Sequence, residues 1–493
     1  MHKKLVLGPI LGLESDHHYT VVVVTDQSAG SVNVSYPHHQ PVPAQLIGEI
    51  DNGKVWRMEL NIDSAGEETI DYTLQQDGLT LLDQRGKQRW SFYVPGDKEK
   101  PKFAYASCNG FSDLTLMNST EAPFRLWETM AQEHQREPFS LLLMGGDQIY
   151  ADAIWTKITA LKRWNELDRK DKVKRRATKD MTRQIDRFYS ELYVDRWNKE
   201  PIASMLASIP SIMMWDDHDI FDGWGSYPED IQTCDVYQAI FRSARKHFEL
   251  LQIRGVHNQS LMSANNQPRT HYGAALSFHG YDILVLDNRS ERTLSQVMGS
   301  AQWQSVTKYL KHNNNQTLLV MSAVPVVYRD FSFAENAVDA TPWEEELTDD
   351  LKDHWRAKEH EGERSRLIMH LLDSGTRRQG RSVILSGDVH VGALGVIRDL
   401  RSADNRAVHQ VVSSGIVHPA PSYMQWLGIC AITNDRTEYL DENHHIVADM
   451  LRPYGSDKYI RARNFATLLE GSDQKLWVNW LTEGKDTPAF PIL

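Results

Sequence analysis

Short runs of β-branched and aromatic residues follow one another through the first hundred residues of the chain. Glycine, asparagine, aspartate and proline separate these runs, which cover residues 19–25, 31–36, 44–50, 55–62 and 69–74. Each run is long enough for one strand and each break offers a turn, a spacing typical of a small antiparallel sandwich. We therefore predict an N-terminal β-sandwich module at residues 1–100, and we find no catalytic cluster in it.

From residue 102 the pattern changes to strands that alternate with helices. Apolar runs with the length of buried strands occur at 103–107, 141–144, 209–215, 283–287, 318–322 and 383–386. Helix-like stretches lie between most of them, at 121–134, 158–195, 237–251, 301–312 and 367–374. This alternation predicts an α/β fold, with strand-like segments at 409–414, 465–470 and 475–482 closing the same domain. In such folds, functional groups gather where the strands end.

Four of these strands end in side chains that bind metal ions. Cys108 follows the first strand, Asp147 and Tyr150 the second, Asp216, Asp217, His218 and Asp219 the third, and Asp388 and His390 the sixth. So many carboxylates in one cleft would raise each other's pKa unless cations compensated their charge. Taken singly, each aspartate can be a helix cap, the tyrosine a core residue and the cysteine a small hydrophobe. Those separate readings do not explain why four strands end alike, so we favour a metal site.

Composition narrows the choice of partners and compartment. The 54 basic and 66 acidic residues give a net charge of −12, which disfavours a nucleic-acid backbone as the main partner. Three cysteines are too few for a disulfide framework. The apolar run at 5–13 is followed at once by Glu14 and Asp16 without a small-residue cleavage site, so we predict a buried strand there rather than an export signal. No apolar run is long enough to span a membrane, and we expect a cytoplasmic protein.

Several segments resemble a known family. They are GDQIYAD at 146–152, WDDHDIFDGWG at 215–225, LDNR at 286–289 with GSAQW at 299–303, DHW at 353–355, LSGDVHVG at 385–392 and VVSSG at 411–415. Together they resemble the signature segments of the PhoD-like alkaline phosphatases, within the calcineurin-like metallophosphoesterase superfamily. The resemblance implies a β-sandwich core flanked by helices, in a catalytic domain at 101–493 preceded by a small all-β domain.

The resemblance also implies a role for each candidate ligand. Asp147 resembles the carboxylate that bridges two metals, and Tyr150 the phenolate given to ferric iron. Cys108 resembles an iron ligand of PhoD-type enzymes. The remaining matches are Asp217 at the position of the superfamily's metal-binding asparagine, His218 at that of the histidine facing the substrate, and Asp388 and His390 at those of two further ligands.

The chain departs from the superfamily pattern in one segment. Many relatives bring a further histidine ligand from a strand that corresponds to 320–325 here, where no histidine occurs. The second metal position is therefore richer in oxygen ligands and harder. We expect two or more metal ions, Fe³⁺ with Ca²⁺ or with another divalent ion such as Mn²⁺, Mg²⁺ or Zn²⁺.

These features predict a metallophosphatase that acts on phosphate monoesters, phosphodiesters or both. We expect His218 to protonate the leaving group or to stabilise the transition state, and Asp219 to orient His218 or a ligand. Arg289 is either a clamp for the substrate phosphate, since guanidinium pairs with phosphate in a bidentate manner, or part of a structural salt bridge. The alternative function is a catalytically degenerate binding or scaffold protein of the same fold. The substrate, small or polymeric, depends on loops around 219–236, 325–365 and 416–450, and the oligomeric state stays open.

Overall fold

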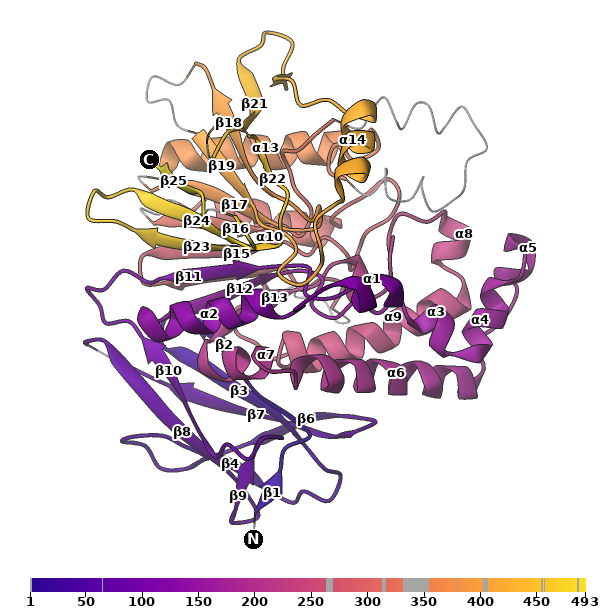
Figure 1. The fold of residues 1–493 in the computed structure, drawn as a ribbon, viewed down its shortest axis with the longest axis vertical. Coiled ribbons are helices and arrows are strands. Elements are labelled where there is room, and N and C mark those ends of the chain that lie inside the picture. Colours follow the sequence, from indigo (N-terminus) through magenta and orange to yellow (C-terminus); the bar gives the residue numbers. More distant parts are fainter. Residues whose placement is uncertain are drawn as a thin grey trace.

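The structure is a computed structural model. It describes residues 2–493 except 64, 263–268, 313–315, 331–353, 379, 402–406, 454, 456 and 486, so Asp353 of the DHW segment and much of the 325–365 loop lie outside the described residues. Within them, the strands form sheets of six, ten and nine strands. Figure 1 shows the N-terminal strands at the bottom, with the remaining strands of the ten-stranded sheet and the nine-stranded sheet above them.

The N-terminal strands form the predicted sandwich. One layer contains β1 (Lys3–Lys4), β4 (Val32–Ser35), β5 (Val42–Pro43), β8 (Glu68–Gln76), β9 (Leu79–Leu82) and β10 (Arg89–Val94). The other contains β2 (Leu7–Ser15), β3 (His18–Thr25), β6 (Gln45–Ile50) and β7 (Gly53–Asn61). Buried and exposed residues alternate along β10, and the rings of Tyr19 and Phe92 lie 5.3 Å apart between the layers. The buried strand expected near the start of the chain is β2.

The second of these layers continues into the sheet of the following domain. Its order runs β6-β7-β3-β2 and then β13 (Ser211–Met214), β12 (Leu141–Gly145), β11 (Phe103–Ala106), β23 (Asn464–Glu470), β24 (Leu476–Thr482) and β25 (Ala489–Ile492). The link is a parallel pairing of Gly12 in β2 with Ser211 in β13. The module predicted at 1–100 therefore shares one sheet with the rest of the protein.

A second sheet packs face to face on the first. It contains β14 (Ala274–Phe278), β15 (Tyr281–Val285), β16 (Thr317–Met321), β17 (Ser382–Ser386), β18 (Gly392–Asp399), β19 (Ala407–Val412), β20 (Glu438–Tyr439), β21 (Ile446–Leu451) and β22 (Tyr459–Ile460). The ring of Phe103 in the first sheet lies 4.8 Å from that of Tyr281 in the second. Strands β11 to β13 are parallel to one another, and so are β15, β16, β17 and β19. The predicted strands thus divide between two layers.

Helices flank the two sheets. Figure 1 shows α2 (Arg125–Arg136), α6 (Lys179–Trp197), α7 (Ile202–Ser208) and α9 (Asp235–His247) below β11, β12 and β13 of the first sheet, and α13 (Glu361–Arg377) above, beside the second sheet. The other helices are α1 (Leu114–Ser119), α3 (Ile154–Lys157), α4 (Thr159–Asn165), α5 (Arg169–Lys172), α8 (Glu229–Gln232), α10 (Ser300–Leu310) and α14 (Tyr423–Ile432). Among the described residues, no helix has both the length and the apolar character to cross a bilayer.

The stretch predicted as helical at 158–195 is three helices rather than one. The side chain of Asp168 accepts a hydrogen bond from the backbone of Asp171 and starts α5. Thr178 does the same for Met181 and starts α6. Such caps satisfy the free backbone N–H groups at a helix start, so each one begins a new helix. The longest of the three, α6, contacts the loop after β13, because the hydroxyl of Tyr189 donates a hydrogen bond to the carbonyl of Ile220.

Candidate metal centre

The candidate ligands follow strands whose carboxyl ends meet at one edge of the stacked sheets. Cys108 follows β11, Asp147 and Tyr150 follow β12, and Asp217 and His218 follow β13, all in the first sheet. Asp388 and His390 follow β17 in the second sheet. Since parallel strands present their carboxyl ends together, Tyr150 and His390 come into contact although they are 240 positions apart in the sequence.

One group of contacts joins Cys108, Asp147, Tyr150 and His390. Oδ2 of Asp147 lies 3.5 Å from Sγ of Cys108 and 3.4 Å from the hydroxyl of Tyr150. That hydroxyl lies 3.2 Å from Nε2 of His390. Thiol, phenol, imidazole and carboxylate therefore converge, a donor set that suits a transition metal such as iron.

A second group of contacts is richer in oxygen. Ligand atoms of Asp147, Asp217 and His218 lie within 4.8 Å of one another, and so do those of Asp216, Asp217 and Asp388. Oδ1 of Asp147 is buried, and no described residue offers it a hydrogen bond. Burying such an atom without a partner is costly, so this oxygen is suited to a cation. Carboxylates in this number fit a hard divalent ion. The residues present therefore fit the metal ions that the sequence led us to expect.

Five of the candidate ligands have a left-handed backbone. Among the described residues, Cys108, Asp147, Tyr150, Asp388 and His390 have φ angles between 53° and 70°. For residues other than glycine this conformation costs on the order of 1–3 kcal/mol each, and it persists only where the surrounding structure enforces it. Strained backbone of this kind clusters at functional sites, so it supports a site here independently of the side-chain chemistry.

Burial favours the neutral, protonated forms of three residues in the group of contacts around Cys108. Burial raises the pKa of the Asp147 carboxyl, of the Cys108 thiol and of the Tyr150 phenol well above their ordinary values. Nearby negative groups add to each shift, Asp147 in the case of the thiol and Cys108 in the case of the phenol. The anionic forms, which are the forms that bind metals, therefore need positive charge beside them.

His218 lies beside this cluster and is oriented by Asp152. Its Nδ1 donates a hydrogen bond to Oδ2 of Asp152 over 2.9 Å, and its ring stacks on Tyr150 with 4.3 Å between centroids. Burial alone would lower the pKa of His218, but the charges of Asp152, Asp217 and Asp147 together raise it well above its ordinary value. His218 therefore favours the imidazolium form.

Asp219 is hydrogen-bonded to the backbone of the two loops that carry Asp147 and Asp217. Its carboxylate accepts hydrogen bonds from the backbone N–H groups of Gln148 and Asp216, each over 2.9 Å, so it fixes the loops that carry Asp147 and Asp217. Burial raises its pKa to about 7. The orienting partner of His218 is Asp152, a residue that the sequence contained within GDQIYAD but that we had not singled out.

Arg289 has no exposed surface and is surrounded by acceptors. Its guanidinium donates to Asp216, to Oδ1 of Asp217 over 3.4 Å and to the carbonyl of Trp224 over 3.1 Å. Of the two roles that the sequence left open, these contacts fit the structural ion pair. They hold Asp217 in place and offset part of the negative charge in the cluster.

The loop after β19 supplies two residues that the sequence analysis did not assign. Oγ of Ser414 lies 3.1 Å from Sγ of Cys108 and accepts a hydrogen bond from the backbone N–H of His390 over 2.8 Å. The ring of His418 stacks on that of His390 with 3.6 Å between centroids. The VVSSG segment had marked the strand end, but only the pairing of β17 with β19 places its loop at the site.

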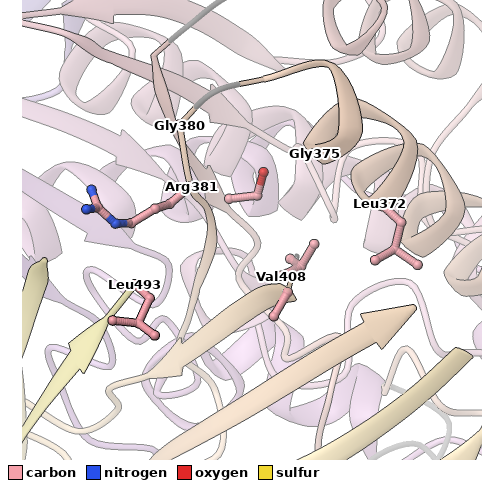
Figure 2. Close-up of a pocket in the computed structure, with 8 residues that line it drawn as sticks. Leu372, Gly375, Gly380, Arg381, Val408 and Leu493 are labelled. Carbon is pink, nitrogen blue, oxygen red and sulfur yellow. The ribbon is translucent and has the colours of Figure 1, made fainter. Parts of the chain in front are cut away.

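A cavity of about 230 Å³ lies at the other end of the second sheet (Figure 2). Its lining includes Arg381, Val408 and Leu493. Arg381 immediately precedes β17, whereas Asp388 follows it, and a strand of this length spans about 16 Å. The cavity is therefore separate from the metal ligands.

Comparison with known proteins places the chain in a family. A family profile described as PhoD related phosphatase matches residues 77–344 and 340–453. The chain belongs to this family. The match includes every candidate ligand, and it also covers β9 and β10 of the N-terminal sandwich.

A curated relative and two solved structures are similar to this chain to different degrees. The relative is an uncharacterized protein of Saccharomyces cerevisiae, 29% identical over 378 residues, which are 64% of this chain and 53% of the yeast protein. The chain thus spans about half the length of that relative.

The solved structures establish the fold. A structure of PhoD superposes with a TM-score of 0.60 at 14% identity, covering 99% of this chain and 89% of PhoD. A purple acid phosphatase from yellow lupin (Lupinus luteus) seeds gives a TM-score of 0.52 at 12% identity, covering 98% and 73%. These matches confirm the metallophosphoesterase-type α/β architecture expected for a PhoD related phosphatase.

Proposed function

We propose that the chain is a metal-dependent hydrolase of phosphate monoesters, phosphodiesters or both, with a metal-activated water as nucleophile at a site for two or more ions. The observation that supports this most strongly is the convergence of Cys108, Asp147, Tyr150 and His390 at one strand edge. The carboxylates of Asp217 and Asp388 lie beside them. Membership of a phosphatase family supports the same reaction class.

The donor atoms form two groups, which are the two ends of the site. Cys108, Tyr150 and His390 would hold Fe³⁺, and Asp217 and Asp388 would hold Ca²⁺ or another divalent ion such as Mn²⁺, Mg²⁺ or Zn²⁺. Asp147 has one oxygen at the first end and a second, unpartnered oxygen, as a bridging ligand requires. When bound, two such ions lower the pKa of a water molecule and offset the charge that develops on the phosphoryl oxygens.

His218 would donate a proton to the leaving oxygen of the ester. Its Nδ1 is committed to Asp152, so Nε2 carries the proton available for transfer. The raised pKa keeps that proton on the ring at neutral pH. General acids of this kind contribute roughly 10²–10⁴-fold to the rate.

Arg289 would act through the ligands. Its buried guanidinium fixes the carboxylates of Asp216 and Asp217, so its contribution is to hold the oxygen-rich end in shape. The substrate would be a phosphate ester, small or polymeric.

The test compares hydrolysis with metal content. The purified chain is assayed with an aryl phosphate and the matching bis-aryl phosphate, with and without a chelator, alongside elemental analysis. We expect chelator-sensitive hydrolysis, lost in Asp147→Asn and kept in Asp230→Asn, since Asp230 is an exposed residue paired with Arg169. A wild-type protein that retains its metals and hydrolyses neither ester would instead be a scaffold.

A second variant separates the acid from the ligands. His218→Ala is expected to lower turnover at least about 100-fold while leaving metal content near that of the wild type. Loss of metal in this variant would assign His218 to the ligand set.

A further inference from the structure

His418 is held against the metal cluster by the backbone of its own loop. Its N–H donates to the carbonyl of Cys108 over 3.1 Å, and Ile416 donates to the carbonyl of Ser107 over 3.1 Å. The turn between them needs Gly415, whose φ is +84° and whose missing Cβ leaves room for the carbonyl of His418. The position of His418 is therefore fixed by the same strand end that positions Cys108.

The ring has one committed nitrogen and one available nitrogen. Nδ1 lies 2.9 Å from the carbonyl of Pro419, which can only accept, so Nδ1 carries the proton and Nε2 a lone pair. The residue is 8% exposed, and no described residue forms a hydrogen bond with Nε2.

A buried histidine of the core shows the contrast. His247 has no exposed surface, and both of its nitrogens are satisfied, Nδ1 by the carbonyl of Ser243 over 2.8 Å and Nε2 by Oγ of Ser190 over 2.9 Å. A histidine with a purely structural role is satisfied in this way. His418 keeps a lone pair beside a cluster of metal ligands.

The stacking geometry limits what that lone pair can bind. The ring of His418 lies parallel to that of His390, with 3.6 Å between centroids and 18° between planes, and 5.6 Å from that of Tyr150. An ion held by His390 would lie near the plane of that ring and therefore away from the plane of the parallel ring of His418. His418 is therefore poorly placed to be a ligand of the same ion, and its Nε2 is left beside the cluster.

We propose that Nε2 of His418 accepts a hydrogen bond from the water molecule that attacks phosphorus. This role rests on the proposed hydrolase function, and it makes His418 a second catalytic imidazole beside His218. The lone pair on Nε2 suits an acceptor, since Nδ1 is the nitrogen that donates to the carbonyl of Pro419.

The test uses variants that separate stacking from hydrogen bonding. His418→Phe keeps a ring beside His390 and Tyr150 but has no acceptor, and His418→Gln restores an acceptor oxygen. We expect His418→Phe to lower kcat at least about tenfold with KM and metal content within twofold of wild type, and His418→Gln to recover part of the loss. The control His312→Phe, at the exposed end of α10, should match the wild type.

Each contrary outcome has a definite meaning. Wild-type kcat in His418→Phe, or a fall in kcat that matches a fall in bound metal, would overturn the role of His418 alone. A wild-type protein without hydrolysis would overturn the proposed function and this role with it. If the variants do not fold, a crystal structure of the metal-loaded wild type with orthovanadate tests the proposal instead. The apical vanadate oxygen takes the place of the attacking water. An apical oxygen within about 3 Å of Nε2 of His418 supports the proposal, and one beyond hydrogen-bonding distance overturns it.

Discussion

Asp152 accepts a hydrogen bond from Nδ1 of His218, with 2.9 Å between Oδ2 and the ring nitrogen. The pair joins the loop after β12 to the loop after β13. It fixes which nitrogen of His218 faces the cluster, and the negative charge of Asp152 is the largest contribution that raises the pKa of the imidazole. The general acid of the proposed reaction therefore depends on Asp152 both for its orientation and for its proton.

Replacement of Asp152 is expected to change the pH dependence of turnover. Asp152→Asn removes the charge that raises the pKa of His218, so His218 loses its proton at lower pH and the alkaline limb of kcat moves to lower pH. We expect turnover near neutral pH to fall roughly 10–100-fold, the range typical when a partner that orients a site histidine is removed. Asp222→Asn is the control, since Asp222 is more exposed and lies 3.9 Å from Nε2. An alkaline limb that does not move would contradict the assignment.

Replacement of Arg289 is expected to lower the free energy of unfolding rather than to weaken substrate binding. Arg289→Met leaves the buried carboxylates of Asp216 and Asp217 without their cation, a change that costs about 3–5 kcal/mol of unfolding free energy. Arg183→Met removes a surface pair with Asp180 and should cost less than about 1 kcal/mol. Denaturant unfolding measures both. A stable Arg289→Met protein with a raised KM alone would instead identify a clamp for the substrate phosphate.

The stability gained from metal is expected to grow with pH. Folding raises the pKa of Asp147, and that of Asp219 to about 7, so the metal-free protein loses stability as pH rises from the ordinary carboxyl range through these raised values. His390 has a lowered pKa, so its contribution is lost as pH falls below its ordinary value, and the test belongs above pH 7. Thermal unfolding with chelator and with excess metal should show a difference in Tm that increases up to pH 9. A constant or shrinking difference would contradict the proposed ligands.

The ferric assignment has a visible signature. If Tyr150 binds Fe³⁺ as phenolate, the iron-loaded protein absorbs visible light through tyrosinate-to-iron charge transfer. Tyr150→Phe should abolish this band, and Tyr439→Phe, at an exposed tyrosine, should keep it. A colourless, iron-free protein with full activity would remove iron from the proposal.

The N-terminal module is expected to be inseparable from the rest of the chain. Removal of residues 2–100 takes away β2, leaves the edge of β13 without its partner, and uncovers the face on which α7 packs against β2. Exposed strand edges favour aggregation. We expect the truncated protein to aggregate or to unfold without a cooperative transition, as measured by size-exclusion chromatography and circular dichroism. A monomeric truncated protein with a sharp transition would show an independent domain.

The strand ends could be predicted from the sequence because their chemistry is local. Cys108, Asp147, Asp217 and Asp388 each follow an apolar run within a few residues, and parallel strands present their ends together. The resemblance implied a β-sandwich core, but the local pattern could not assign each strand to one of its two sheets. An apolar run of four or five residues carries no record of which strand pairs with it, and Gly12 pairs with Ser211 across 199 positions.

The residues that the sequence analysis missed share a physical reason. Asp152 and His418 act through contacts between loops of different strands, at distances that depend on both loops. For Arg289, sequence could not decide between two roles, because the choice depends on whether the guanidinium reaches solvent or buried carboxylates. The sequence showed which chemical groups the site could contain. The burial of these side chains and their hydrogen-bond partners could be determined only from the folded structure.

The left-handed backbone at five ligand positions also limits how this site can change over evolutionary time. Glycine adopts such φ angles freely, and asparagine tolerates them better than most residues. A descendant that abandoned hydrolysis would therefore retain the shape of these loops most easily by exchanging Cys108, Asp147, Tyr150, Asp388 or His390 for one of these two residues. Relatives that carry glycine or asparagine there would preserve the outline of an active site whose chemistry had been lost.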